Sequence, residues 1–454
     1  MRIVQREIDM LHGSLWDKII IFALPLALTG VFQQLFNAAD VVTLGKFVDK
    51  NAMAAVGNNI SLIGLFVNLF MGLSLGGNVV IARFIGAKRP DRANVAVQTA
   101  FLLALFTGIG VMVLGEAFTG LIMEWMQVPD AVRGMSEAYL RIYLLAMPVI
   151  GLYNFEAAIF RARGDTQTPL ISLIIASVLN IALNLLFVLV FDWGVPGVAA
   201  ATDIANVTAA GYLLRGLMKT EGVIHIDPGH LTLDRSTLKE MVRIGLPAGI
   251  QGMVFSLANL VIQSAINSLG PDAMAGSAAG FTIEINVYCV VGAFAQAATT
   301  FVSQNYGARK MIRCRMVIRY CLFLNALVTG VMSIIIVGSA EPLMAFFSSD
   351  PNVIHDGVIR LYYIVGPEII CVIYEVLASA LRGYGISMAP AILTLVAVCG
   401  VRLIWVFTLF QAVPTYECLM ACYPASWIVN DIFMIGAYFF YRNQIKVMRS
   451  FDAA

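Results

Sequence analysis

Residues 25–40 read PLALTGVFQQLFNAAD, and a related apolar stretch, PAGIQGMVFSLAN, occupies residues 247–259. Both stretches place proline, glycine and asparagine at the same spacing, and each match lies 222 positions further along the chain. The matching residues are Pro25 with Pro247, Gly30 with Gly252, and Asn37 with Asn259. Because each stretch opens a long apolar segment, the sequence predicts the same helix twice.

The repeat extends through both halves of the chain. The basic turn GAKR at residues 86–89 returns as GARK at residues 307–310, which is 221 positions later. Further matches, 219 positions apart, are Arg141 with Arg360, Pro148 with Pro367, Glu156 with Glu375, Arg163 with Arg382, and Gly164 with Gly383. Internal repeats of apolar helices are typical of membrane transporters.

The composition excludes a soluble protein. Of 454 residues, 59% are hydrophobic and 13% are charged, and such a chain in water would expose large apolar patches. A helix that crosses about 30 Å of hydrocarbon needs roughly 20 apolar residues. We therefore predict an all-α membrane protein with twelve transmembrane helices. They are expected near residues 18–45, 53–82, 94–122, 131–160, 168–191, 196–218, 240–268, 273–305, 316–338, 355–381, 388–411 and 419–441.

Basic residues predict the orientation in the membrane, because Lys and Arg accumulate in cytoplasmic loops. Most of the 29 basic residues lie near the termini and in every second connection, so both termini are expected in the cytoplasm. The formal net charge of +1 indicates no nucleic-acid partner. The bilayer is the only large partner that the composition implies.

The polar stretch at residues 221–239 is predicted to be a cytoplasmic linker between an N-terminal lobe, 1–220, and a C-terminal lobe, 240–454. Six helices in each lobe make the two repeats parallel, with a two-fold axis along the membrane normal. A cleft between two such bundles could open to each side in turn. Within the first lobe, Gly72 and Gly76 form a pattern of small residues that favours close helix packing.

Charged side chains inside hydrocarbon cost on the order of 3 kcal/mol each, so each needs a partner or a function. In the first half, Asp40, Asn180, Asn184, Thr202 and Asp203 fall at a similar depth on three helices. Such a group could bind Na⁺ through hard oxygen ligands, with Asp40, Asn180 and Thr202 as candidates, or could hold a proton on a carboxylate. The alternative is a structural polar network between the helices.

The second half has three acids and one base near the middle of the membrane, namely Glu284, Glu368, Asp431 and Arg402. If the arginine pairs with one acid, the others could bind a proton or a cationic cargo; alternatively, the group only fixes helix packing. The residues expected to line a substrate cleft are Gln34, Phe36, Asn37, Met253, Glu284, Tyr288 and Glu368. Two further pairs are expected at outer helix ends: Glu137 with Arg141, and Asp356 with Arg360.

Four motifs carry a family resemblance: FNAAD at 36–40, NIALN at 180–184, GVAAAT at 197–202 and QNYGA at 304–308. Together they resemble the multidrug and toxic compound extrusion (MATE) family, on its bacterial DinF-like side. The resemblance implies a V-shaped bundle of two six-helix lobes that exports amphipathic, often cationic compounds in exchange for H⁺ or Na⁺. It also implies a coupling role for Asp40 with Asn180 and Thr202, and an acidic position at Glu284.

The sequence departs from this family at Asn184, where the pattern usually has aspartate. Losing that carboxylate weakens the electrostatic case for Na⁺ and leaves Asp40 as a proton carrier. Asp203 could return the charge, but it lies about 100° around its helix from Thr202. Proton coupling is therefore expected, with Na⁺ as the alternative.

Two other functions compete with multidrug efflux. A lipid-linked oligosaccharide or lipid flippase of the same superfamily should have a more cationic cleft, because its cargo carries phosphate. An intramembrane enzyme would need a nucleophile with its base, or metal ligands, within the spans, yet the histidines lie outside them; they are His12, His225, His230 and His355. We expect no enzymatic activity, no cofactor and a functional monomer.

Overall fold

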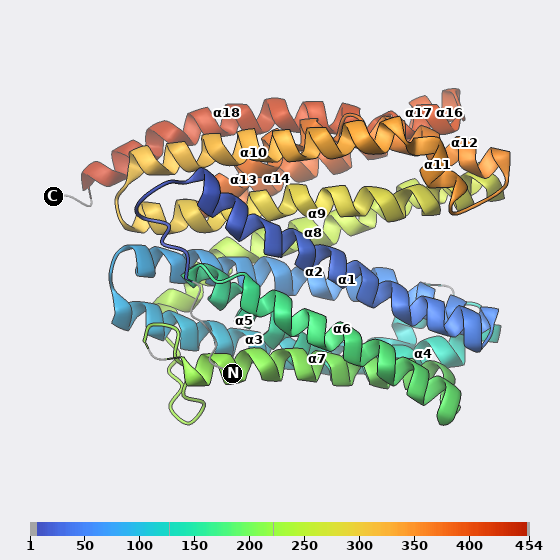
Figure 1. Cartoon of the computed structure of the whole chain (residues 1–454), viewed down its shortest axis with the longest axis horizontal. Coiled ribbons are helices and arrows are strands. Elements are labelled where there is room, and N and C mark those ends of the chain that lie inside the picture. The colour runs from blue at the N-terminus through green and yellow to red at the C-terminus, as the bar shows by residue number, and fades with distance from the viewer. Residues whose placement is uncertain (1–6, 127, 221, 452–454) are drawn as a thin grey trace. The chain divides into compact units, whose positions relative to one another are not determined.

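The computed structural model describes residues 7–126, 128–220 and 222–451, and every regular element in these ranges is helical (Figure 1). The helices group into two compact units. Unit 1 contains Leu28–Gly249 with the short segment that ends at Ile8, and unit 2 contains Asp9–Ala27 with the chain from Ile250 onward.

The chain up to Ser268 forms nine elements. They are α1 (Trp16–Phe47), α2 (Lys50–Gly86), α3 (Pro90–Trp125), α4 (Asp130–Leu145), α5 (Met147–Arg163), α6 (Gln167–Leu185), the short π-helical turn η1 (Leu186–Val190), α7 (Gly194–Lys219) and α8 (Arg235–Ser268). Two of these, α1 and α8, are shared between the units: the first part of α1 belongs to unit 2 and the first part of α8 to unit 1. Both divisions lie close to a proline inside the helix, Pro25 in α1 and Pro247 in α8.

The second half forms the remaining elements. They are α9 (Pro271–Gly307), α10 (Met311–Gly338), α11 (Ala340–Ala345), α12 (Pro351–Arg360), η2 (Leu361–Val365), η3 (Glu368–Ile370), α13 (Cys371–Gly383), α14 (Met388–Thr394), η4 (Leu395–Gly400), α15 (Val401–Phe407), α16 (Leu409–Ala412), α17 (Tyr416–Met420) and α18 (Cys422–Phe451). The short π and 3₁₀ turns join consecutive helices into longer spans.

Within the described residues, ten helices or runs of helices are long and apolar enough to cross a membrane. An eleventh span forms from α4 and α5, which meet at an angle of 49°. The span expected near 131–160 is therefore present but bent, because Pro148 follows the break and cannot donate the hydrogen bond that would continue α4. The expected helix near 196–218 is present as α7, but its many small residues make it less apolar than the other spans.

Small residues let the helices of unit 1 touch backbone to backbone. A Cβ atom added to Gly72 of α2 would lie 2.1 Å from the backbone nitrogen of Gly249 in α8. One added to Gly76 would lie 2.2 Å from the carbonyl oxygen of Met241. The close packing that the sequence predicts at these two glycines is confirmed.

A linker segment, residues 222–234, follows α7 and packs along α3 in unit 1. Ile224 and Ile226 are fully buried in the core of this unit. The segment ends at Asp234, whose carboxylate accepts hydrogen bonds from Ser236 and Thr237 at the start of α8. These hydrogen bonds, Ser236 first, lower the pKa of Asp234 to about 2. The cap therefore stays ionised at neutral pH and fixes the first turn of α8.

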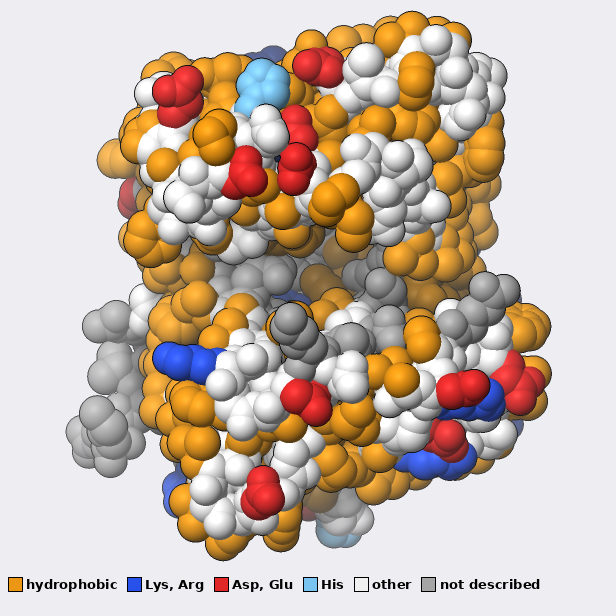
Figure 2. All heavy atoms as spheres, turned by 90° about the vertical axis from the view of Figure 1, so that its right-hand side faces the viewer, with side chains coloured by type: hydrophobic (Ala, Val, Ile, Leu, Met, Phe, Trp, Pro, Cys, Tyr) orange, Lys and Arg blue, Asp and Glu red, His pale blue; other side chains and the backbone are white. Residues whose placement is uncertain are grey.

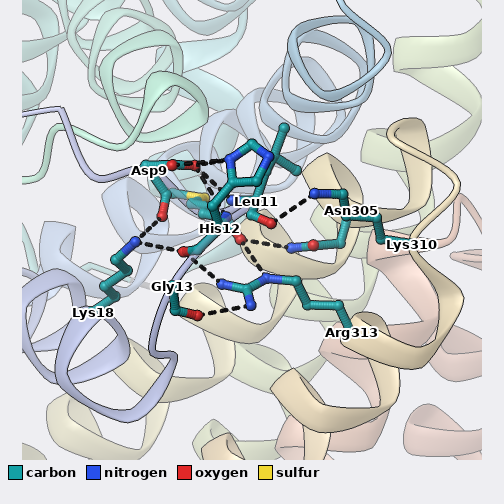
Figure 3. A network of polar contacts seen from close by, with 9 residues as sticks. Asp9, Leu11, His12, Gly13, Lys18, Asn305, Lys310 and Arg313 are labelled. Atoms are coloured by element: carbon teal, nitrogen blue, oxygen red, sulfur yellow. Dashed lines mark hydrogen bonds and ion pairs between the residues drawn. The ribbon is translucent and has the colours of Figure 1, made fainter.

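In unit 2, the strap, residues Asp9–Gly13, lies against the turn between α9 and α10 (Figure 3). Arg313 donates to the carbonyl oxygens of Met10, His12 and Gly13 at 2.9–3.0 Å. Two neighbours bind the strap in the same way: Asn305 donates to Met10 O at 3.1 Å and Lys310 to Leu11 O at 2.9 Å. The Met10 side chain is fully buried. The strap thus ties the start of α1 to unit 2.

The charged side chains are unevenly distributed over the ends of unit 2. Figure 2 shows the face where α12 and α17 begin, and acidic side chains gather on its upper part, which is unit 2. The acids at helix starts are Asp272 in α9, Glu341 in α11, Asp350 before α12 and Glu417 in α17. The basic turn with Lys310 and Arg313 lies at the other end of α9.

Gly72→Ala should lower the melting temperature of the purified protein, because the added methyl group collides with α8 and overpacking costs about 1–3 kcal/mol. Gly64→Ala on the same helix is the matched control, since nothing lies within 4 Å of its added carbon. The control should be neutral or slightly stabilising, because alanine favours a helix. Equal melting temperatures for the two variants would contradict the packing described.

Arg313→Gln should loosen the strap, because one glutamine amide replaces at most part of three charge-assisted hydrogen bonds. Hydrogen exchange of the amides in residues 9–15 should become faster than in wild type. Arg92→Gln, at the position 221 residues earlier in the repeat, should leave this exchange unchanged. Unchanged exchange in both variants would mean that Arg313 does not hold the strap.

Candidate functional site

A buried polar cluster in unit 1 joins α1, α6 and α7. Asp40 accepts hydrogen bonds from Asn184 Nδ2 at 2.7 Å and from Asn180 Nδ2 at 3.2 Å, both to Oδ1. Thr202 Oγ1 donates to Asp40 Oδ2 at 2.7 Å. Asn180 also donates to Thr202 Oγ1 at 3.2 Å. The four side chains therefore form one connected network around the carboxylate.

Helix geometry explains this convergence. Asn180 and Asn184 are one turn apart, so their side chains leave the same face of α6. The neighbouring helix α7 carries Thr202 among alanines that let α6 and α7 pack closely. Asp40 is 4% exposed, and the two asparagines and Thr202 are at most 1% exposed. The structure brings together four of the five residues that the sequence singled out, and their role in coupling stays a prediction.

The charge of Asp40 has no basic partner among the described residues. Its hydrogen bonds come from two amides and one hydroxyl, all of which are neutral. Hydrogen bonds offset part of the cost of burying an ionised carboxylate, but they do not neutralise it. The cluster therefore contains one buried group whose charge can be removed by a single proton.

Asp203 does not join this network. Its side chain is half-buried, and its buried Oδ1 atom has no hydrogen-bond partner in the part of the chain that the structure describes. Asn184 Oδ1 is likewise buried without a partner. Asp203 thus adds a second acidic group near Asp40 without a direct bond to it.

Two tyrosines of α4, Tyr139 and Tyr143, were not recognised from the sequence. Both hydroxyl groups lie close enough to Asp40 and Asp203 to interact electrostatically with these carboxylates. Their rings pack against each other, with centroids 6.0 Å apart. The signal in the sequence was their spacing of four residues, the same as that of the two asparagines on α6.

A second buried polar group lies in unit 2. Arg360 Nε donates to Glu284 Oε2 at 2.8 Å, and its Nη1 donates to Ser277 Oγ at 2.7 Å. The exposed fractions of the two charged side chains are 5% and 12%. The expected pair of Arg360 with Asp356 is wrong: the arginine turns inward to α9 and pairs with Glu284, since a buried charge without any partner is costly. The Glu137–Arg141 pair is confirmed at 2.9 Å.

Arg402, expected near three acids, pairs with none of them among the described residues. It is 1% exposed and donates to Ser426 Oγ and Asn259 Oδ1, both at 3.2 Å. Its guanidinium carbon lies 4.2 Å from the centroid of the Tyr423 ring. Polar side chains and an aromatic face thus replace a carboxylate as its partners.

Glu368 and Asp431, the other two acids predicted near the middle of the membrane, also form no ion pair within the described residues. Glu368 is 2% exposed, and its Oε2 has no hydrogen-bond partner. Asp431 Oδ1 accepts a hydrogen bond from the backbone N–H of Tyr374 at 2.9 Å. Unit 2 therefore buries more acidic groups than the Glu284–Arg360 pair neutralises.

The remaining residues expected in a substrate cleft have different environments. Tyr288 donates from its hydroxyl to Glu375 Oε1 at 3.0 Å. Phe36 is 4% exposed and packs in a core cluster of unit 1 with Ala176, Ala205 and Ala209, so it contributes to packing. Gln34 and Met253 are half-buried, and Asn37 is exposed.

The repeated helices and the buried cluster match one family model. The MatE model matches residues 25–186 and 247–408, which are the two halves of the repeat. The chain belongs to the MatE family. It is a multi-pass membrane transporter of the bacterial MATE type rather than an enzyme.

Relatives of this MATE protein match it over most of its length. "Probable multidrug resistance protein YoeA" of Bacillus subtilis is 27% identical over 447 residues, covering 96% of both chains. "Probable multidrug resistance protein NorM" of Thermotoga maritima is 28% identical and covers 85% of this chain and 84% of its own. The "FAD transporter" of Shewanella oneidensis is 25% identical and covers 86% and 89%.

Solved structures confirm the MATE fold. An outward-facing structure of a multidrug resistance MATE family transporter superposes with a TM-score of 0.88, over 98% of this chain and 99% of that chain. The sequence identity is 21%. The fold is therefore shared over 98% of this chain, although most residues differ.

Glu284→Gln should lower the stability of this MATE protein by about 3 kcal/mol, because it leaves the buried Arg360 charge without a partner. Thermal unfolding of the purified protein measures the loss. Glu137→Gln is the control, since Arg141 is 46% exposed, and it should cost less than about 1 kcal/mol. Equal losses would show that burial does not distinguish the two pairs.

Proposed function

We propose that this MATE protein exports amphipathic organic cations in exchange for protons. The observation that carries the proposal is the Asp40 carboxylate, which is buried among neutral hydrogen-bond donors. Proton uptake removes its charge and leaves no unpaired counter-charge behind. Release of the proton restores the charge, so the cluster can alternate between two states.

The donors around Asp40 favour H⁺ over Na⁺. A sodium ion is bound by oxygen atoms. In this cluster the nitrogen atoms of Asn180 and Asn184 face the carboxylate, so both amides would have to turn for a sodium ion to bind at Asp40. Because position 184 holds asparagine, a sodium ion in this cluster would have one carboxylate, that of Asp40, in direct contact with it. A proton needs no such rearrangement.

The charges inside unit 2 and the names of the relatives both support a cationic cargo. Glu368 and Asp431 have no basic partner among the described residues, so unit 2 holds two acidic groups that could interact with a cationic cargo. Two relatives that match most of this chain are named as probable multidrug resistance proteins. We extend that activity to this protein, with the two lobes opening in turn to each side of the membrane.

We place the protein in the plasma membrane of a bacterium, as a monomer with both termini in the cytoplasm. The acidic end of unit 2 in Figure 2 then faces outward, and the basic turn with Lys310 and Arg313 faces inward. This orientation follows the distribution of Lys and Arg across membranes.

A second candidate is the transport of a phosphate-bearing compound, as in a lipid flippase. Arg402 favours it, because this buried guanidinium has no carboxylate partner in the described chain. One relative is named as an FAD transporter, and FAD contains phosphate. The acids that outnumber Arg402 in the same unit make this the weaker candidate.

Proteoliposomes that contain the purified protein and a fluorescent organic cation test the proposal. A proton gradient alone should drive efflux by the wild type, and Asp40→Asn should reduce the rate at least about tenfold, since one well-placed proton-carrying group contributes that much or more. Asp49→Asn is the matched control. Asp49 caps α2 through a hydrogen bond from the N–H of Ala52, and asparagine caps a helix equally well.

Each outcome separates the candidates. Efflux driven only by Na⁺ would overturn proton coupling. Full proton-driven efflux in Asp40→Asn would remove Asp40 from the mechanism. If neither gradient moves the cation, multidrug efflux of cations fails, and the phosphate-bearing cargo becomes the better candidate.

A further inference from the structure

A long groove lies on unit 2 between α10, α13 and α18. Its volume is about 870 Å³. Most of its walls are apolar, with Leu322 of α10, Ile373 of α13 and Ile435 of α18 among the lining residues. Its size is in the range of a drug-sized ligand or of lipid acyl chains. The mechanism proposed above does not use it.

Three arginines line the groove as well, at one end. Arg315 and Arg319 lie one turn apart near the start of α10, and Arg442 lies near the end of α18. All three guanidinium groups are close enough to Tyr438 to interact electrostatically with its hydroxyl. The groove is thus amphipathic, with a cationic end and an apolar length.

These positive charges are not compensated by acidic partners among the described residues. No carboxylate forms an ion pair with Arg315, Arg319 or Arg442 in the described part of the chain. Arg442 Nε is buried and has no hydrogen-bond partner there. Like charges four residues apart on a helix repel each other. An anion at this end would relieve the repulsion and satisfy the buried donor.

The repeat explains why unit 2 has this groove. In unit 1, a Cβ atom on Gly108 would lie 2.4 Å from the Cα atom of Pro148, so α3 and α5 touch. The residue 221 positions after Gly108 is Thr329, which is larger. Gly151 of α5 likewise corresponds, 219 positions later, to Ile370, and this isoleucine lines the groove. Unit 2 thus lacks the two glycines that bring the corresponding helices into contact in unit 1.

In unit 1, the linker segment covers the positions of α3 that correspond to the arginines of α10. Asn94 donates to the carbonyl oxygens of Val223 and His225, at 3.3 and 2.8 Å. Gln98 Oε1 accepts a hydrogen bond from the N–H of Thr232 at 2.9 Å. The residues 221 positions later are Arg315 and Arg319. Where unit 1 has neutral amides that bind a peptide backbone, unit 2 thus has two cations.

We propose that this groove binds one anionic phospholipid of the membrane, with its phosphate at Arg315, Arg319 and Arg442 and an acyl chain along the apolar wall. Basic pockets between helices at the cytoplasmic side suit anionic headgroups. The end that holds the three arginines is the basic end of unit 2, next to the turn between α9 and α10. The site is independent of the cargo and of the coupling ion.

Native mass spectrometry of the delipidated full-length protein tests the proposal. Wild type should bind dioleoyl phosphatidylglycerol in preference to dioleoyl phosphatidylcholine. Arg315→Gln, Arg319→Gln and Arg442→Gln should each weaken binding of the anionic lipid about fivefold, and the triple variant should lose the preference. Arg215→Gln, an exposed arginine on α7 of unit 1, should retain it.

A second variant separates the lipid from a free anion. Ala326→Trp fills the apolar groove and keeps all three arginines, so it should weaken binding of the whole lipid. Unchanged lipid binding in this variant, or full displacement of the lipid by millimolar inorganic phosphate, would mean that the arginines bind only a phosphate group. Equal binding of the two lipids by wild type would overturn the proposal outright, as would an unchanged preference in the triple variant.

Discussion

The absence of water in the membrane interior is the constraint on which the rest of this structure depends. A lipid-embedded backbone must satisfy its own hydrogen bonds, so every regular element in the described chain is a helix. The same constraint makes each buried charge expensive. For Arg360 this cost is offset by an ion pair with Glu284. For Arg402 it is offset by hydroxyl, amide and aromatic partners. The Asp40 carboxylate has only neutral hydrogen-bond donors around it, which is why it is suited to exchange a proton.

The two halves of the repeat have kept the fold but not the same surfaces. In unit 1, glycines bring α3 against α5, and the linker segment covers α3. In unit 2, Thr329 and Ile370 occupy the corresponding positions, and a groove with a cationic end separates the helices. One duplicated framework thus gives two chemically different bundles: one holds an isolated acidic cluster, and the other holds an ion pair together with a basic, apolar groove.

Hydropathy and the repeat predicted nearly all of the fold, because both depend on long stretches of sequence. The depth of residues along their helices also predicted that Asp40, Asn180, Asn184 and Thr202 meet. Pairings between side chains were harder to predict. Asp356 is one turn from Arg360, yet the arginine reaches Glu284 on another helix, because the cost of burial outweighs a short sequence separation. The position of Tyr139 and Tyr143 near Asp40 likewise depends on packing that periodicity does not encode.

The sharing of α1 and α8 between the units has a consequence for the order in which the chain can fold. Unit 1 includes the first part of α8, and unit 2 includes the strap and the first part of α1. During synthesis, unit 1 is therefore incomplete until residue 249 has been made. The strap lies near the start of the chain, yet its three hydrogen bonds with Arg313 can form only after that residue has been made.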